Sequence, residues 1–179
     1  MAYHLDVDVP VSLNPVTNFE KVIEFNKCFG VQVADTVQKN ICMENPNLTR
    51  LRLGLILEEV KELRNAHTNN DFVEIVDAMA DILYVVYGMG ASYGVPLDKA
   101  FDIVHKSNMS KLCTTEQEAI DTVQWYHDQY SRGLCPYDSP EYRKGDYKNQ
   151  QFWVVYNANT GKILKNINYK AANFQSLLE

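Results

Sequence analysis

Six acidic side chains in two neighbouring segments are the residues of this sequence best suited to chemistry. Residues 55–63 read LILEEVKEL and residues 71–90 read DFVEIVDAMADILYVVYGMG. A helix turns about 100° per residue, so acids three positions apart lie on one face. Clustered carboxylates are the hard oxygen ligands that bind a divalent cation such as Mg²⁺. The six acids are Glu58, Glu59, Glu62, Glu74, Asp77 and Asp81.

The second segment gives its acids no broad polar face. Residues 73–86 are apolar on almost every side of a helix, so we expect Asp77 and Asp81 to point toward protein. A buried carboxylate is costly unless it is paired or bound to metal. For Glu58, Glu59 and Glu62 a solvated face with lysine partners one turn away is an equally good interpretation.

A short turn at residues 67–70 separates the two segments, which predicts antiparallel neighbouring helices. The two sets of acids then face each other, and their like charges disfavour joint ionisation. A hard cation removes that repulsion. Magnesium binds one or two carboxylates together with substrate phosphates and water, so we expect Mg²⁺, with Mn²⁺ as a substitute.

The elements that must position these acids are mostly helical. Capping-box spacing at Thr17 and Thr115, and the stop signals Gly30, Gly94 and Gly133, predict where several helices begin and end. The fold class is all-α, an antiparallel helix bundle with a small C-terminal β-hairpin, in one domain at 1–179 with its core at 17–132 and an appendage at 133–179. The predicted helices cover residues 17–30, 47–66, 70–93, 97–110 and 115–132, and a weaker helical pattern covers 33–43. The predicted hairpin strands cover 152–156 and 162–166. Residues 1–16 and 133–151 are predicted to be irregular.

Composition excludes some classes of function. The net charge of −6 disfavours nucleic acid as a partner. The longest uncharged apolar stretch, residues 82–97, is too short to cross a bilayer, and the first residues lack the pattern of a signal peptide. The four cysteines form no CxxC pair, which predicts reduced thiols in a cytoplasmic protein.

The pattern Glu-Glu-x-x-Glu followed by Glu-x-x-Asp resembles the all-α nucleoside triphosphate pyrophosphohydrolases. That superfamily includes MazG proteins, dimeric dUTPases and phosphoribosyl-ATP pyrophosphohydrolases. The resemblance is strongest over residues 48–112, and the insert at 113–151 departs from the family pattern. The pieces that carry it are EEVKE at 58–62, EIVD at 74–77, ADILY at 80–84, KSNMSK at 106–111, and a tail of GKILK at 161–165 with Tyr169, which is similar to the end of MazG-like proteins, many from phages.

The resemblance implies magnesium-dependent hydrolysis of a ribo- or deoxyribonucleoside triphosphate to the monophosphate and pyrophosphate. The implied metal ligands are Glu59, Glu62, Glu74 and Asp77. Glu58 and Asp81 take catalytic roles, Glu58 by positioning the attacking water and Asp81 by holding a further ion or orienting the ligands. The basic and polar residues implied to bind substrate are Lys106, Asn108 and Lys111, with Lys162 and Lys165 as weaker candidates.

Several questions stay open at this level. The base is undefined, with a purine (dGTP, GTP or dATP) as the first candidate, and the aromatics that could stack on it are Trp125, Tyr126, Trp153 and Tyr156. Phosphoribosyl-ATP of histidine synthesis is an alternative substrate. A di-iron bundle is disfavoured, because no Glu-x-x-His pair exists. A helical interaction module with incidental carboxylates is the non-enzyme alternative. We also expect a homodimer or homotetramer, because the helix at 73–93 is more apolar than one small bundle covers.

Overall fold

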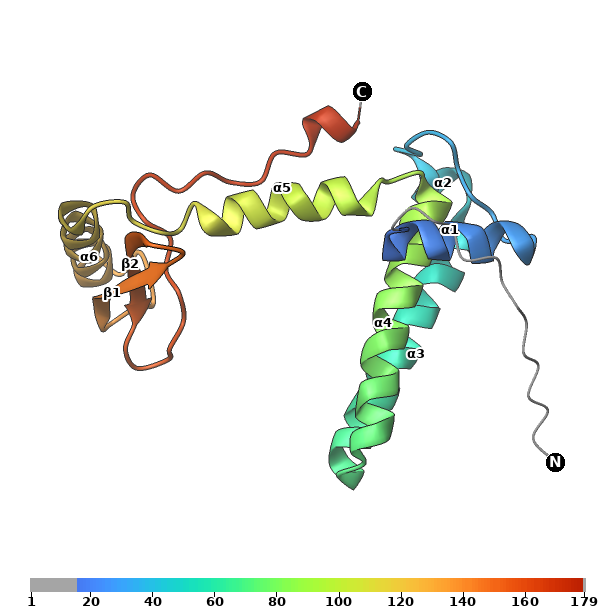
Figure 1. Ribbon diagram of the computed structural model, residues 1–179, viewed down its shortest axis with the longest axis horizontal. Coiled ribbons are helices and arrows are strands. Elements are labelled where there is room, and N and C mark those ends of the chain that lie inside the picture. The colour runs from blue at the N-terminus through green and yellow to red at the C-terminus, as the bar shows by residue number, and fades with distance from the viewer. Residues whose placement is uncertain (1–15, 179) are drawn as a thin grey trace. The chain divides into compact units, whose positions relative to one another are not determined.

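The computed structural model describes residues 16–178, so the predictions for residues 1–15 lie outside the described residues. Its helices are α1 (Asn18–Cys28), α2 (Ile41–Glu44), α3 (Pro46–Asn69), α4 (Phe72–Tyr93), α5 (Leu97–Met109) and α6 (Glu116–Ser131), and its strands are β1 (Pro140–Tyr147) and β2 (Gln150–Asn157) (Figure 1). A short 3₁₀ turn follows at Gln175–Leu177. The predicted class, mostly helical with a small hairpin, is confirmed.

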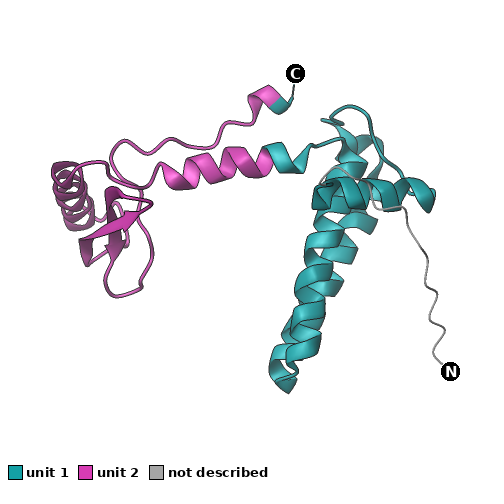
Figure 2. Cartoon of the chain, in the orientation of Figure 1, with its two compact units in different colours: residues 1–99, 177–179 teal, residues 100–176 magenta. Residues whose placement is uncertain are grey.

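The described chain divides into two compact units (Figure 2). Unit 1 contains residues 16–99 with 177–178, and unit 2 contains residues 100–176. The division falls inside α5. The single domain with a boundary at residue 132 stays a prediction. No helix in the described part of the chain is long and apolar enough to cross a membrane.

In unit 1, α3 and α4 form an antiparallel pair (Figure 1). Asn70, in the left-handed conformation with φ 53°, ends α3, and Asp71 begins α4 by accepting hydrogen bonds from two backbone N–H groups. The turn is shorter than predicted, because α3 continues to Asn69. Two consecutive cap residues thus hold the two helices side by side in fixed register.

Helix α1 packs on the second half of α4. Thr17 and Glu20 form the predicted capping box. Phe25 meets the ring of Tyr84 edge-on, with centroids 5.5 Å apart. The loop that follows donates from the backbone N–H of Gln38 to the carbonyl of Tyr93 at 2.9 Å.

The weak helix predicted at 33–43 is wrong except at its end. Only Ile41–Glu44 is helical, and the preceding residues form an extended loop. The backbone N–H of Ala34 bonds to the carbonyl of Ala91, and the Ser92 hydroxyl donates to the carbonyl of Gln32. Hydrogen bonds to the end of α4 therefore replace the internal bonds that a helix would make.

Unit 2 is built on the β1–β2 hairpin and α6. The two strands are antiparallel and joined by Lys148 and Asn149, both with positive φ, as a tight two-residue turn requires. Its core contains Cys113, Ala119, Tyr126, Val155 and Leu164.

The predicted partner strands of the hairpin are wrong. Residues 152–156 do form a strand, but they pair with residues 141–145, which the sequence indicated as irregular. Residues 162–166 contribute only one bridge, between Tyr156 and Ile163. The polar side chains of β1 suit one solvent-facing strand of a hairpin, so polarity did not mark a loop.

Candidate functional site

Glu59 lies at the centre of the acidic cluster. Its Oε2 atom is buried and has no hydrogen-bond partner among the described residues. Burial raises the pKa of the Glu59 carboxyl, and the charges of Glu62, Asp81, Glu58 and Asp77 raise that pKa further. Asp77 and Asp81 belong to α4, whereas the other three belong to α3. Acids from both helices therefore lie within electrostatic reach of one carboxyl group.

The sixth acid of the pattern, Glu74, meets Glu62 at the turn end of the helix pair. Glu62 of α3 and Glu74 of α4 line the same open cleft of about 310 Å³. Asn65, Asn69 and Asp71 also line it. The cleft thus offers carboxylate and amide oxygens from both helices, which are ligands for a hard cation.

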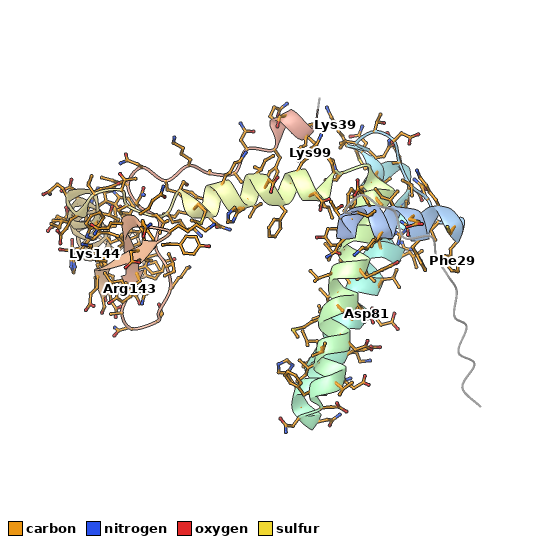
Figure 3. The ribbon with its side chains drawn as sticks, viewed as in Figure 1. Phe29, Lys39, Asp81, Lys99, Arg143 and Lys144 are labelled. Atoms are coloured by element: carbon orange, nitrogen blue, oxygen red, sulfur yellow. The ribbon has the colours of Figure 1, made fainter. Side chains whose placement is uncertain are left out.

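The prediction that Asp77 and Asp81 point toward protein is wrong for the single chain. Both side chains are exposed, and Figure 3 marks Asp81 on the α3–α4 pair. Helix α4 has α3 on one side and α1 across its second half, so much of its apolar surface stays uncovered. Phe72 and Val73 are 73% and 75% exposed. The acids share that uncovered surface.

The donor set fits a divalent cation in its chemistry. As the side chains stand, no three Asp, Glu, His or Cys groups within residues 16–178 are close enough together to hold one ion. Glu59 nevertheless keeps a buried oxygen without a partner, beside four further acids. A cation bound there would give the Glu59 oxygen a ligand and would neutralise part of the negative charge of the five acids.

The three residues predicted to bind substrate belong to unit 2. Lys106 and Asn108 are exposed near the end of α5, and Lys111 is half-buried just beyond it. The Lys111 ammonium donates to Oδ1 of Asn108 at 2.8 Å. The structure therefore brings two of the three together, and their role with substrate stays a prediction.

The tail holds this segment in place. The Asn166 side-chain amide donates to the carbonyls of Ser110 and Leu112 at 3.1 and 2.6 Å. The hydroxyls of Ser107 and Tyr169 are 2.9 Å apart. Two of the sequence pieces that carry the resemblance, far apart in the chain, thus lie against each other.

The four aromatic candidates for base stacking separate into two groups. Trp125 and Tyr126 of α6 line a cleft in unit 2, as do Lys162 and Lys165. Trp153 and Tyr156 lie on β2, where Trp153 packs against the core of the unit and Tyr156 donates to Glu141. The structure favours the first pair for contact with a ligand.

Some polar residues of the site region carried no signal in the sequence. Arg52 of α3 and Asn26 of α1 are buried, and each has side-chain nitrogen atoms without a hydrogen-bond partner among the described residues. Burial lowers the pKa of Arg52. Tyr137, which lines the cleft of unit 2, lies in the insert that matched no pattern. Only the folded packing of these side chains distinguishes them from ordinary surface residues.

Comparison with known proteins bears on these two helices directly. A family model of phosphoribosyl-ATP pyrophosphohydrolases matches residues 22–108, which include α3, α4 and all six acids. A mimivirus protein, the uncharacterized protein L479 of Acanthamoeba polyphaga mimivirus, is 31% identical over an alignment that covers 91% of this chain and 96% of that protein. The chain belongs to the all-α nucleoside triphosphate pyrophosphohydrolase superfamily.

Membership in this pyrophosphohydrolase superfamily indicates hydrolysis of a phosphoanhydride bond and agrees with the acid pattern. The matched residues end at Asn108, so α6 and the β1–β2 hairpin lie beyond the family model.

Proposed function

We propose that this chain hydrolyses a nucleoside triphosphate to the monophosphate and pyrophosphate at the acids of α3 and α4, with Mg²⁺ bound. The observation that carries the proposal is the buried Oε2 atom of Glu59, which has no hydrogen-bond partner among the described residues and lies near acids of both helices. A carboxyl group without a partner among like charges is costly for stability alone. It is useful where a cation and a polyphosphate bind.

In this proposal Glu59, Glu62, Glu74 and Asp77 hold the metal ions. Bound Mg²⁺ supplies a charge that neutralises the triphosphate and lowers the pKa of a coordinated water. Glu58 orients the attacking water toward the α-phosphorus. The new bond joins that water oxygen to the α-phosphorus, the bond to the bridging oxygen of the β-phosphate breaks, and pyrophosphate leaves.

The remaining assigned residues position these groups. Asp81 orients the ligand carboxylates or holds a further ion from the next turn of α4. Lys106 and Lys111 bind phosphate oxygens as point charges, and Asn108 hydrogen-bonds the sugar or a phosphate. Positioning and charge neutralisation account for most of the catalysis in phosphoryl transfer.

We further propose that the chain works as a homodimer or homotetramer. The exposed apolar side chains on α3 and α4 are too many for a free surface of this size, because large contiguous apolar patches mark interfaces. A second copy that covers these apolar side chains also shelters Asp77 and Asp81. The exposed apolar side chains on the two helices include Leu53, Leu57, Val60, Phe72, Val73, Val76, Met79 and Leu83. Light scattering tests this directly, and a monomer at micromolar concentration contradicts it.

The test of the activity is a screen of the common ribo- and deoxyribonucleoside triphosphates with identification of products. We expect monophosphate and pyrophosphate in equal amounts with Mg²⁺ or Mn²⁺, and none in EDTA. Glu62→Gln and Asp77→Asn should lower turnover at least about a thousandfold with unchanged helical content, whereas Glu24→Gln, an exposed acid of α1, keeps full activity. Retained turnover in either site variant contradicts the metal assignment.

Phosphoribosyl-ATP is the second candidate substrate, because the matching family model is that of phosphoribosyl-ATP pyrophosphohydrolases. Turnover of phosphoribosyl-ATP without release of pyrophosphate from any nucleoside triphosphate favours it. Thermal melting with and without Mg²⁺ separates both enzymes from a non-catalytic helical module, whose midpoint the metal leaves unchanged.

A further inference from the structure

A cleft in unit 2 combines aromatic rings with basic side chains. Its volume is about 340 Å³, which lies within the range of small-molecule sites. No acidic residue is among the described residues that line it. The lining residues that matter here are Lys111, Lys162, Lys165, Trp125, Tyr126 and Tyr137.

The floor of this cleft is fixed by hydrogen bonds. The Tyr126 hydroxyl donates to the carbonyl of Lys165 at 3.0 Å and accepts from the N–H of the same residue at 3.2 Å. The backbone N–H of Leu164 donates to the carbonyl of Val155 in the hairpin at 2.9 Å. Because Leu164 is also buried, the segment that carries Lys162 and Lys165 is anchored to the core and the cleft is preformed.

The three ammonium groups have neutral neighbours. Lys162 donates to the Tyr137 hydroxyl at 2.6 Å, and Lys111 donates to the side-chain oxygen Oδ1 of Asn108 at 2.8 Å. Lys165 lies 4.5 Å from the ring centroid of Tyr169. Three positive charges around one concavity, held by neutral groups, create a potential that attracts an anion.

The aromatic side chains add a second requirement for the ligand. Trp125 is 46% exposed although it is large and apolar, and its ring contacts Tyr126 edge-on at 4.8 Å between centroids. Tyr126 in turn meets Tyr137 edge-on at 5.8 Å. An exposed indole beside a basic cleft suits a flat aromatic group, because base–aromatic stacking contributes about 1–3 kcal/mol per base.

We propose that this cleft is a nucleotide-binding site on unit 2 that needs no metal. The lysines bind the phosphate group and Trp125 stacks on the base. The acids of α3 and α4 repel a free phosphate unless a cation is present, so EDTA separates the two sites. The inference does not rest on hydrolysis at those acids.

The test is a titration of the full-length protein in EDTA with AMP, GMP, CMP and UMP, in which binding is measured by calorimetry and by tryptophan fluorescence. We expect at least one nucleotide to bind with a dissociation constant below about 1 mM and to quench the fluorescence. Lys162→Met and Lys165→Met should each weaken binding about tenfold or more, because each removes a positive charge that can form a charge-assisted hydrogen bond with the phosphate. Lys170→Met, an exposed lysine of the same unit that does not line the cleft, should bind as the unchanged chain does.

Further arms identify the ligand chemistry. Inorganic phosphate and adenosine alone should each bind at least tenfold more weakly than AMP, and a short single-stranded oligonucleotide no more tightly per site than a mononucleotide. Glu62→Gln should keep the affinity in EDTA, so loss of hydrolysis and loss of this binding are separate outcomes. Absence of binding for all four nucleotides, equal affinity in the lysine variants that retain the melting midpoint, or phosphate binding as well as AMP overturns the proposal.

Discussion

Replacing Glu59 by Gln tests how the acidic cluster affects stability. The pKa of this carboxyl is raised in the folded chain, so the folded state holds a proton more readily than the unfolded state. Stability therefore falls as pH rises from the pKa of the unfolded chain through the raised pKa, and the penalty is fully present above the raised pKa. Gln carries no charge, and the variant should escape that penalty.

The magnitude follows from the buried oxygen. A buried acceptor without a partner costs about 1–3 kcal/mol, and more when it is charged. Gln removes the charge but keeps a polar atom at the same place, so we expect the free energy of unfolding to rise by only about 1 kcal/mol. For a chain of this length that corresponds to a rise in melting midpoint of about 2–4 °C. The measurement is thermal unfolding in EDTA at pH 7, with Glu24→Gln as a control that should not move.

With Mg²⁺ present, the unchanged chain should become more stable than Glu59→Gln. At a concentration ten times its dissociation constant, a ligand of the folded state adds about 1.4 kcal/mol of stability. The unchanged chain should gain this and Glu59→Gln much less. A fall in midpoint for Glu59→Gln in EDTA, or equal shifts with Mg²⁺ in both proteins, refutes the reasoning.

Three further outcomes can be measured on single variants. Gly94→Ala should lower the melting midpoint by at least about 4 °C, because Gly94 has φ +69° and an added Cβ clashes with the backbone carbonyl of Thr36. Gly30→Ala, also at positive φ but with open space around it, should lower the midpoint about half as much or less, and equal losses contradict the clash. Arg52→Met should leave the free energy of unfolding unchanged or raise it by about 1 kcal/mol, since the guanidinium is buried and two of its nitrogens have no hydrogen-bond partner within the described part of the chain. Denaturant unfolding measures this, and a fall in the free energy of unfolding of more than about 2 kcal/mol contradicts the expectation. Thiol titration at pH 8 should label the two exposed cysteines quickly and Cys113 only on unfolding, because burial raises the pKa of that thiol to about 11; rapid native labelling of all four contradicts this.

The helix boundaries of this chain were predictable where a local interaction determines them. The Thr17 side chain caps α1 by accepting from the backbone N–H of Glu20, and the Asp71 side chain caps α4 by accepting from the backbone N–H groups of Val73 and Glu74. Gly94 ends α4 in the left-handed conformation that glycine adopts most readily. Such signals need only the neighbouring residues and are therefore readable in sequence.

Features that depend on distant segments were not predictable. The loop before α2 is fixed by hydrogen bonds to the carbonyls of Ala91 and Tyr93, which lie more than fifty residues away. Tertiary hydrogen bonds there override local propensity. The pairing of β2 with β1 is local but was also missed, because the polar side chains of β1 look like a loop in sequence.

The candidate site was also predictable only in part. The i, i+3 spacing of the acids and the short turn predicted that the acids of two helices approach each other, and the pKa of Glu59 reflects that approach. Their burial was predicted wrongly, because an apolar helix surface can stay uncovered in a single chain. The sequence shows that such a surface needs a partner, and does not show whether the same chain supplies it.

The most direct test of the central claim is a titration of Mn²⁺, followed by electron paramagnetic resonance, into the unchanged chain and two variants that each remove one acid from one helix. The variants are Glu59→Gln on α3 and Asp77→Asn on α4. If acids of both helices form one metal site, both variants should bind Mn²⁺ at least about tenfold more weakly. Affinity equal to that of the unchanged chain in either variant contradicts a site shared by the two helices.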